Sequence, residues 1–330
     1  MKKNKLVLLD FSNIMYSTFF SLMGSNVDNE KFFSESINLW KHLILNSIIS
    51  YSRKFKVDTK NMVLCFDEKY VWRNDIFKYY KKNRKKGRDN SGIDFKKFFE
   101  EMDIFKKELN ENFPLMSLQC TKAEADDIIY ILCKKLSSKY ELIVGSMDKD
   151  LRAVLRFDNV KFFNIKRQGG KWINIDKREI PAMMQRHIIM GDVSDGIPNI
   201  FSDEDTYMND SKKSKRLGDK KITEIIENGL DNYITTKKQR ERYEQNTRLI
   251  DMEFIPDEII KNIEKEFIKE FKKDKKWDKA IKWLEHNKFR NILKDLDKDF
   301  INDSFEYAEK SMSKWSDKIK EKNSNNHSLF

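Results

Sequence analysis

Cysteine, proline and glycine are scarce in this sequence, which has 3, 4 and 10 of them among 330 residues. So little glycine and proline excludes a collagen-like or low-complexity chain. The cysteines are odd in number, lie in or beside apolar runs, and show neither a disulfide framework nor a zinc-binding spacing. We therefore expect buried free thiols at Cys65, Cys120 and Cys133, in a reducing compartment.

Long hydrophobic runs are also missing. No apolar stretch approaches the ~18 residues that a membrane helix needs, and the charged start of the chain is followed only by Leu6 to Leu9 before Asp10. We therefore expect a cytoplasmic protein that does not bind membranes, and the length predicts about two domains. What the sequence has in excess is positive charge, with 65 Lys and Arg against 54 Asp and Glu. The resulting net charge of +11 favours a polyanionic partner such as nucleic acid.

Three short apolar runs, residues 5–10, 61–67 and 141–148, each end in an aspartate. Such runs are typical of buried strands in a parallel sheet. Longer segments of helical periodicity lie between them, notably residues 37–55 and 95–113. The alternation of strands and helices predicts an α/β fold with a parallel sheet.

The three terminal aspartates, Asp10, Asp67 and Asp148, would then share one edge of the sheet, where ligand sites of open α/β sheets form. A single aspartate at a strand end is usually only a turn residue. Three together would repel one another, and a divalent cation is the simplest remedy. Oxygen ligands without a histidine cluster indicate Mg²⁺ or Mn²⁺ rather than zinc.

Further acids occur in short-spaced groups. Glu124, Asp126 and Asp127 open a predicted helix, where Thr121 with Glu124 also fits a capping box, although this would not require the two aspartates. The remaining acids follow the third strand or lie in a turn after residue 190. The candidate metal ligands are thus nine carboxylates, a number that suggests two metals: Asp10, Asp67, Glu124, Asp126, Asp127, Asp148, Asp150, Asp192 and Asp195.

Residues 78–88 contain seven Lys or Arg among eleven, with no acid. A run of this kind is usually a solvated helix face. This one closely follows the strand that ends at Asp67, and its aromatic residues can stack on bases. A metal cluster beside a basic and aromatic segment suits phosphodiester hydrolysis, in which two cations stabilise the attacking and leaving oxygens.

At this point the sequence resembles the flap endonuclease and 5′→3′ exonuclease family, and most closely its ribonuclease H branch from T-even bacteriophages. The resemblance covers about residues 5–270. It is carried by these motifs, in order: Leu-Leu-Asp-Phe-Ser-Asn (8–13), Val-Leu-Cys-Phe-Asp (63–67), Trp-Arg (72–73) with Tyr-Tyr-Lys-Lys-Asn-Arg (79–84), Glu-Ala-Asp-Asp (124–127), Asp-Lys-Asp (148–150), Gly-Asp-Val-Ser-Asp (191–195) and Arg-Leu-Ile-Asp-Met-Glu-Phe-Ile-Pro (248–256).

The resemblance implies a PIN-like nuclease domain over residues 1–185, with a helical arch at about 70–95. A helical, helix-hairpin-helix type module that grips duplex DNA would follow at 186–270. The family's Gly-x-Gly-x-Lys hairpin is not intact there, because an acidic-then-basic insertion occupies about 200–215 and only Gly218 and Lys220 match. Residues 271–330 lie beyond the resemblance, and their spacing predicts a helical pair and a polar tail.

The resemblance also assigns roles to residues. The nine acids would hold two Mg²⁺ ions, for which Mn²⁺ can substitute. Lys81 and Arg84 would contact the scissile phosphate as catalytic residues. The predicted nucleic-acid contacts are Arg73, Tyr80, Lys81, Arg84, Lys85, Lys86, Gly218 and Lys220. The four histidines fall in no motif, and His42, His187 and His286 are expected to be ordinary surface or core residues.

The implied function is a metal-dependent 5′→3′ exonuclease and flap endonuclease with ribonuclease H activity. Such an enzyme removes RNA primers and 5′ flaps during DNA replication, here as a phage-encoded monomer in the host cytoplasm. Its substrates would be flapped or nicked DNA and RNA–DNA hybrids, and candidate partners are a sliding clamp, through the apolar end Leu329-Phe330, and a single-stranded-DNA-binding protein. Two alternatives stay open, a PIN-like ribonuclease acting on RNA only and a non-catalytic nucleic-acid-binding or metal-binding protein.

Overall fold

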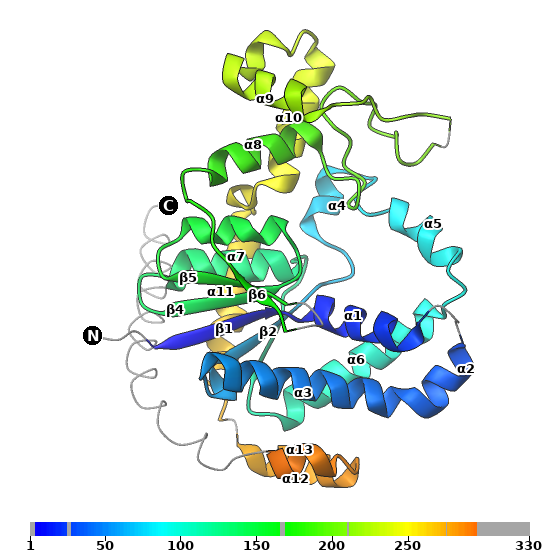
Figure 1. The fold of residues 1–330 in the computed structure, drawn as a ribbon, viewed down its shortest axis with the longest axis vertical. Coiled ribbons are helices and arrows are strands. Elements are labelled where there is room, and N and C mark those ends of the chain that lie inside the picture. Colours follow the sequence, from blue (N-terminus) through cyan, green and yellow to red (C-terminus); the bar gives the residue numbers. More distant parts are fainter. Residues whose placement is uncertain (1–3, 25–27, 166–168, 210, 275, 296–330) are drawn as a thin grey trace, which may run out of the picture.

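The computed structural model describes residues 4–24, 28–165, 169–209, 211–274 and 276–295 (Figure 1). Its centre is a six-stranded sheet in the order β3-β2-β1-β4-β5-β6, in which only β6 runs antiparallel to its neighbour. The strands are β1 (Lys5–Asp10), β2 (Met62–Phe66), β3 (Met116–Gln119), β4 (Glu141–Ser146), β5 (Val160–Asn164) and β6 (Lys171–Ile173). The predicted α/β class and the three predicted strands are confirmed.

Helices cover both faces of this sheet, because its central strands are apolar on both sides. In β1, Leu6 and Leu8 face one layer, and Val7 and Leu9 face the other. The first layer holds α7 (Ala125–Leu136), α11 (Asp257–Phe271) and the 3₁₀ segment η3 (Asp150–Arg156). The second holds α1 (Phe11–Met23), α3 (Ile37–Phe55), α6 (Phe95–Asn112), α12 (Trp277–His286) and α13 (Arg290–Asp295).

A separate group of helices stands beyond the first layer. It consists of α8 (Ile180–Met190), α9 (Asp219–Asn228) and α10 (Lys237–Ile250). Ile189, Ile200, Ile225 and Leu230 form its small core, against which Tyr243 of α10 packs. After α10 the chain returns to the sheet, since Ile263 and Phe267 of α11 are buried in the first layer. The helical module is therefore connected to the sheet at both of its ends.

Two short helices, α4 (Trp72–Ile76) and α5 (Asn83–Asp89), lie on the side to which the carboxyl end of β1 points (Figure 1). Phe77 and Tyr80 pack with Ile188, Ile197 and Leu249, so the segment between α4 and α5 is attached to the helical module. The remaining elements are α2 (Asn29–Lys31), the π-helical turn η1 (Phe32–Ser36), and the 3₁₀ turns η2 (Thr59–Asn61), η4 (Leu230–Asn232) and η5 (Met252–Phe254).

The predicted helical pair near the C-terminus is present as α12 and α13, whose buried Leu284 and Ile292 pack in the second layer. The part of the predicted helical region beyond residue 295 lies outside the described residues, as does the candidate clamp-binding pair Leu329-Phe330. The three cysteines are buried free thiols, as expected. Among the described helices, none combines the length and the apolar character that crossing a membrane requires.

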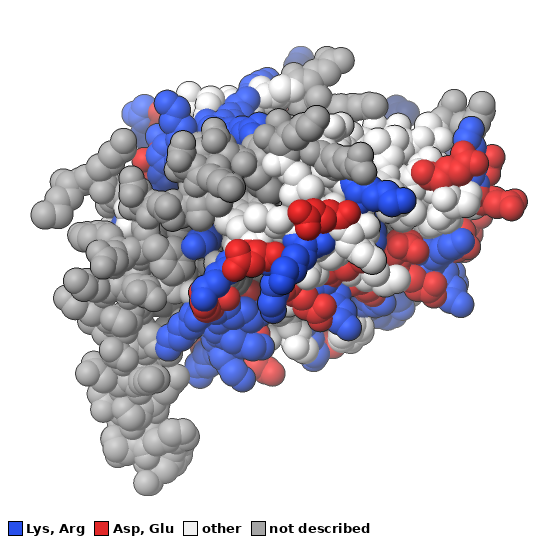
Figure 2. All heavy atoms as spheres, turned by 90° about the horizontal axis from the view of Figure 1, so that it is seen from below, with Lys and Arg blue, Asp and Glu red and all other residues white. Residues whose placement is uncertain are grey.

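Seen from below the view of Figure 1, positive and negative side chains are interspersed over the described part of the surface (Figure 2). The densest positive run along the chain is instead the exposed face of α5, which carries Lys85, Lys86 and Arg88. The densest run of positive charge in the sequence thus lies near the carboxyl edge of the sheet.

Gly191 ends α8 and starts the turn that carries two of the candidate ligands. Its φ of +66° lies where L-residues rarely occur, and a Cβ atom there would approach the carbonyl oxygen of Ile197 to 2.3 Å. Gly24, which ends α1, has the same φ of +66° but open space around it. Comparing the same substitution at the two positions therefore separates the cost of backbone strain from the cost of steric crowding.

We expect Gly191→Ala to destabilise the protein clearly more than Gly24→Ala. The strain common to both is about 1–3 kcal/mol, and only at Gly191 must the turn also move to admit the new methyl group. Urea denaturation midpoints of the two variants measure the difference. Equal losses of stability would show that the turn after α8 is not tightly constrained.

Candidate active site

Three of the candidate carboxylates meet at one edge of the sheet, as predicted. Asp10 ends β1, Asp67 follows β2, and Asp148 lies two residues after β4, and β1 stands between β2 and β4. Asp10 accepts hydrogen bonds from Ser146 Oγ at 2.8 Å and from the backbone N–H of Asn13 at 3.3 Å. Burial, together with the charges of Asp67 and Asp148, nevertheless raises the pKa of Asp10 to about 7.

The start of α7 brings two more acids, Glu124 and Asp126, close to this edge. The backbone N–H of Ala125 donates to Asp67 at 2.9 Å, which fixes the helix end beside β2. Asp126 then faces the strand-end aspartates, and its pKa lies well above the usual range because of burial and the charges of Asp10, Asp148 and Asp67. Among the described residues, none donates a hydrogen bond to the Asp126 carboxylate.

The structural alternative for this group, a capping box of Thr121 with Glu124, is not what the structure shows. Residues 121–123 cannot start a helix, because Lys122 forms a parallel bridge with Val71 and accepts a hydrogen bond from the N–H of Trp72 at 2.9 Å. The helix begins at Ala125, with Glu124 as the preceding residue. Asp127, and not Thr121, completes the cap by accepting the N–H of Glu124 at 3.0 Å.

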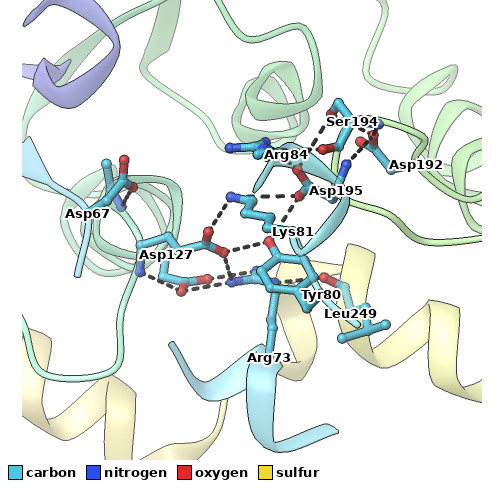
Figure 3. Close-up of polar contacts among 12 residues, drawn as sticks. Asp67, Arg73, Tyr80, Lys81, Arg84, Asp127, Asp192, Ser194, Asp195 and Leu249 are labelled. Carbon is cyan, nitrogen blue, oxygen red and sulfur yellow. Dashed lines mark hydrogen bonds and ion pairs between the residues drawn. The ribbon is translucent and has the colours of Figure 1, made fainter. Parts of the chain in front are cut away.

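Asp127 is not brought together with the other acids. It is fully buried, and its carboxylate forms an ion pair with Arg73 at 2.8 Å (Figure 3). The same carboxylate accepts a hydrogen bond from Trp72 Nε1 at 2.9 Å. Arg73 itself is only 5% exposed and also donates to the carbonyl of Leu249 at 2.8 Å. The predicted metal ligand Asp127 and the predicted nucleic-acid contact Arg73 therefore form a buried pair that joins α4, α7 and the end of α10.

Glu124 and Asp195 are bridged by Tyr80 and Lys81, which belong to the segment 70–95 that the sequence predicts as the arch (Figure 3). The hydroxyl of Tyr80 lies 2.8 Å from a carboxylate oxygen of Glu124 and 2.9 Å from one of Asp195, so its single proton can be donated to either, and the ring of Tyr80 is buried. The ammonium of Lys81 forms an ion pair with Glu124 and lies 3.8 Å from Asp195. Tyr80 is thus an internal residue rather than a surface contact for nucleic acid.

The charged groups at this bridge strongly affect one another's pKa values. Burial by itself would raise the pKa of Glu124, but the cations of Lys81 and Arg73 outweigh it and hold that pKa at about 2. Arg84 forms an ion pair with Asp195 at 2.5 Å and donates to the carbonyl of Ser194 at 3.0 Å. The backbone N–H of Lys81 also donates to the carbonyl of Asp195 at 2.8 Å, so the arch is attached to the turn 191–195.

A second group of ligand atoms joins η3 to the end of α8. Nδ1 of His187 lies 3.5 Å from Asp150, and Nε2 lies 3.3 Å from Asp192. Burial, together with the charges of Asp148 and Asp192, raises the pKa of Asp150 to about 6 even though His187 opposes it. The pKa of Asp192 stays below its usual range, because hydrogen bonds from His187 and Ser194 outweigh burial.

The expectation that His187 is an ordinary helix residue is wrong, since it lies between two candidate ligands. Its position in the sequence gave one usable signal, the spacing of five residues from Asp192 across the end of a helix. That spacing brings the side chains of His187 and Asp192 together only if the turn after α8 folds back over the end of the helix. Here it does, because the N–H and C=O of Asp192 both pair with Ile197.

Residues between 68 and 96, together with Glu124, line a cavity of about 850 Å³, and among the described residues of its lining Glu124 is the one candidate metal ligand. Glu124 and Lys81 lie at its inner wall, and Lys85 and Arg88 of α5 line its outer part. Met208, from the predicted insertion at 200–215, closes one side, and Glu204 of the same segment pairs with Lys78 at 3.3 Å. The insertion therefore reaches the arch.

Two of the other predicted contacts, Gly218 and Lys220, are placed apart from this cavity. Gly218 precedes α9, and Lys220 lies in its first turn within the helical module (Figure 1). Asp219, between them, forms an ion pair with Arg186. Lys85 and Lys86 are exposed on α5.

The donor set fits divalent cations bound by oxygen. Asp10, Asp67 and Asp126 lie close together, and burial and neighbouring carboxylates raise the pKa of each, although the charge of Lys81 opposes this at Asp67. Around Glu124 and Asp195, by contrast, Lys81 and Arg84 supply the positive charge. A hard cation at the strand-end aspartates would replace the protons that their raised pKa values retain.

We expect the protein stripped of divalent cations by EDTA to lose stability as the pH rises from 5.5 to 8. Asp10 has a folded-state pKa of about 7 against an ordinary value of 3.8, so the folded protein retains a proton that the unfolded chain releases. Stability from such a group is present at low pH and is lost as the pH rises through the folded-state pKa. Asp150, with a pKa of about 6, acts in the same direction.

Melting temperatures across this pH range measure the effect, and saturating Mg²⁺ should abolish most of it because the cation takes the place of the protons. The groups with lowered pKa, Glu124 and Asp192, titrate below this range and do not interfere. A melting temperature that rises with pH in EDTA would contradict the crowding of these acids.

Two family models cover almost the whole described chain. Residues 5–185 match the model of the 5′-3′ exonuclease, N-terminal resolvase-like domain, and residues 177–298 match the model of the C-terminal part of T4 RNase H. Ribonuclease H of Enterobacteria phage T4 is 31% identical over 268 residues, which span 79% of this chain and 85% of the phage protein. A 5′-3′ exonuclease of Buchnera aphidicola is 29% identical over 208 residues, which are 60% of this chain and 66% of that protein.

Solved structures share the fold. The 5′-exonuclease of phage T5 with bound zinc aligns with a TM-score of 0.56 at 17% identity, over 82% of this chain and 100% of its own. A T5 flap endonuclease solved with DNA and metal ions aligns over the same shares with a TM-score of 0.57 at 16% identity. The resemblance noted from the sequence motifs is thereby confirmed.

Proposed function

Because the chain belongs to the 5′-3′ exonuclease family, whose members are phosphodiester hydrolases, we propose that it is a divalent-metal-dependent 5′→3′ exonuclease and flap endonuclease with ribonuclease H activity. The observation that carries the proposal is the convergence of Asp10, Asp67, Asp126 and Asp148 at the carboxyl edge of the sheet, next to a cavity lined by basic residues. Removal of RNA primers and 5′ flaps by a phage-encoded enzyme is the role we infer.

We assign two Mg²⁺ positions to these acids, with Mn²⁺ as a substitute. The first would be held by the strand-end aspartates with Asp126 and Glu124, and the second by Asp150, Asp192 and Asp195. When bound, such ions lower the pKa of a water and stabilise negative charge on the phosphate. Asp127 is left out of both positions, because its carboxylate is already committed to Arg73.

The protein's own contribution is to position the scissile phosphate. Lys81 and Arg84 already lie against Glu124 and Asp195, so their positive groups stand at the edge of the metal positions. When a phosphate enters, the same groups can donate to its oxygens and hold it in line. This arrangement requires no side-chain general base.

Substrate binding would extend over two surfaces. Exposed Lys85 and Lys86 on α5 would contact a single-stranded 5′ end in the cavity, and the helical module would hold duplex through Gly218 and Lys220. We accordingly keep the division into a nuclease unit at 1–185, a duplex-binding module at 186–270 and an extension at 271–330 as part of the proposal. Clamp binding through Leu329-Phe330, binding to a single-stranded-DNA-binding protein and a monomeric state stay predictions.

The deciding experiment is digestion of 5′-labelled flap DNA, nicked duplex and RNA–DNA hybrid in Mg²⁺ and in EDTA. We expect short 5′-terminal products from all three substrates in Mg²⁺ only. Cleavage of RNA alone, with the DNA flap left intact, would favour a PIN-like ribonuclease. Binding without cleavage would favour a non-catalytic protein, and both outcomes would reject the proposal.

A further inference from the structure

His187 is the one histidine among the described residues that lies against carboxylates of the proposed metal edge. It stands on the last turns of α8, half-buried, with a carboxylate facing each ring nitrogen. Ligand atoms of Asp150, His187 and Asp192 all lie within 4.8 Å of one another. The three residues come from two separate segments, so their meeting is a property of the fold.

These distances suit a single cation with little movement of the side chains. Bonds of about 2.1 Å place neighbouring ligand atoms of an octahedral ion about 3 Å apart, and opposite ones about 4.2 Å apart. The observed separations are 3.3 Å from Nε2 to Asp192 and 3.5 Å from Nδ1 to Asp150, so each ring nitrogen and the carboxylate that faces it fall in that range. Because a cation can bond only one nitrogen of the ring, it would meet that nitrogen and an oxygen of the carboxylate that faces it.

The surroundings also orient each ligand. The other oxygen of Asp192 accepts the N–H of Ser194 at 2.7 Å and of Asp195 at 3.2 Å, which turns its free oxygen toward His187. Once one nitrogen of His187 binds a cation, the other N–H can donate to the remaining carboxylate. A carboxylate behind a histidine ligand is the arrangement that commonly fixes its ring and tautomer in metal sites.

We propose that His187 is a direct ligand of the second metal position, which makes that position a mixed nitrogen and oxygen site. The assignment of Asp150 and Asp192 to a metal position rests on the proposed nuclease function. The bond between a cation and a ring nitrogen of His187 does not depend on that function. Imidazole adds more to the binding of Mn²⁺, Co²⁺ or Zn²⁺ than to that of Mg²⁺. The second position should therefore discriminate between these metals, whereas the all-oxygen first position should do so much less.

The test uses Mn²⁺ as the probe and the full chain. Pulsed electron paramagnetic resonance of the Mn²⁺-loaded protein reports a directly bonded ¹⁴N nucleus, and titration of free Mn²⁺ gives the affinities. We compare wild type with His187→Gln, which retains a polar side chain, and with His286→Ala, which removes an exposed histidine on α12. Equal melting temperatures in EDTA would show that His187→Gln is folded, and a destabilised variant is replaced by His187→Asn.

We expect a ¹⁴N signal in wild type and in His286→Ala, and its loss in the His187 variant. One class of Mn²⁺ site should weaken by about 10-fold or more, while Mg²⁺ affinity changes less. A wild-type protein without the signal, or a His187 variant that keeps it, would overturn the proposal. Flap cleavage in Mg²⁺ is measured in parallel, so that a wild type with the nitrogen signal but no cleavage would reject only the proposed function.

Discussion

Asp126→Asn is expected to reduce cleavage by about 1,000-fold or more while making the cation-free protein more stable. Loss of one metal-binding carboxylate removes several kcal/mol of charge stabilisation at the phosphate, and each 1.36 kcal/mol is about tenfold in rate. In the cation-free state the same change relieves repulsion from Asp10 and Asp148, and it breaks no hydrogen bond among the described residues. Single-turnover cleavage and urea denaturation in EDTA measure the two effects.

The neighbouring residue provides a matched control. Asp127→Asn should lower stability by about 3–5 kcal/mol, because it leaves the buried guanidinium of Arg73 with a weakened partner. The two substitutions are chemically identical and one position apart, yet we expect stability to change in opposite directions. If both variants were destabilised alike, Asp126 would be a structural residue and not part of a metal position.

Lys81→Ala is expected to lower the single-turnover rate by about 100- to 1,000-fold, the usual cost of losing one donor to transition-state charge, while substrate affinity changes much less. A second effect should accompany it. The ammonium of Lys81 neutralises Glu124 and lies near Asp195, so it competes with a cation for these carboxylates. Mn²⁺ should therefore bind Lys81→Ala more tightly than wild type in the absence of substrate.

Lys85→Ala is the control for this experiment, because Lys85 lines the same cavity but is exposed on α5. Its loss should weaken binding and reduce the salt dependence of binding by about one ion, with little change in rate at saturating substrate. If the two variants changed the single-turnover rate and substrate binding in the same way, both lysines would only attract phosphate groups. The assignment of Lys81 as a catalytic residue would then fail.

The strand-end aspartates could be predicted from the sequence because two simple rules combine at them. Buried parallel strands read as apolar runs, and their carboxyl ends share an edge. The choice between Asp126 and Asp127 could not be made in the same way. Adjacent helix residues point about 100° apart, so the rotation of α7 decides which one faces the sheet edge, and that rotation is set by its packing in the first layer.

Arg73 and His187 show a different limit. A charged residue beside a basic run reads as exposed, but Arg73 is buried because Glu124 and Asp127, some fifty residues later in the chain, supply its counter-charge. His187 meets Asp150 through contact between α8 and η3, and no local pattern encodes that contact. Both misses concern partners that only the tertiary fold brings together.

The return of the chain to the sheet through α11 has a consequence for synthesis on the ribosome. Ile259, Ile263 and Phe267 cover part of the apolar face formed by β3 and α7, and they are translated after every other element of that layer. A nascent chain that has emerged only as far as α8 therefore has all the strand-end carboxylates but an incompletely covered core. The first layer can be completed only after the whole helical module has been synthesised. A chain that ends before α11 should therefore be degraded by proteases instead of folding into an active nuclease that lacks its duplex-binding module.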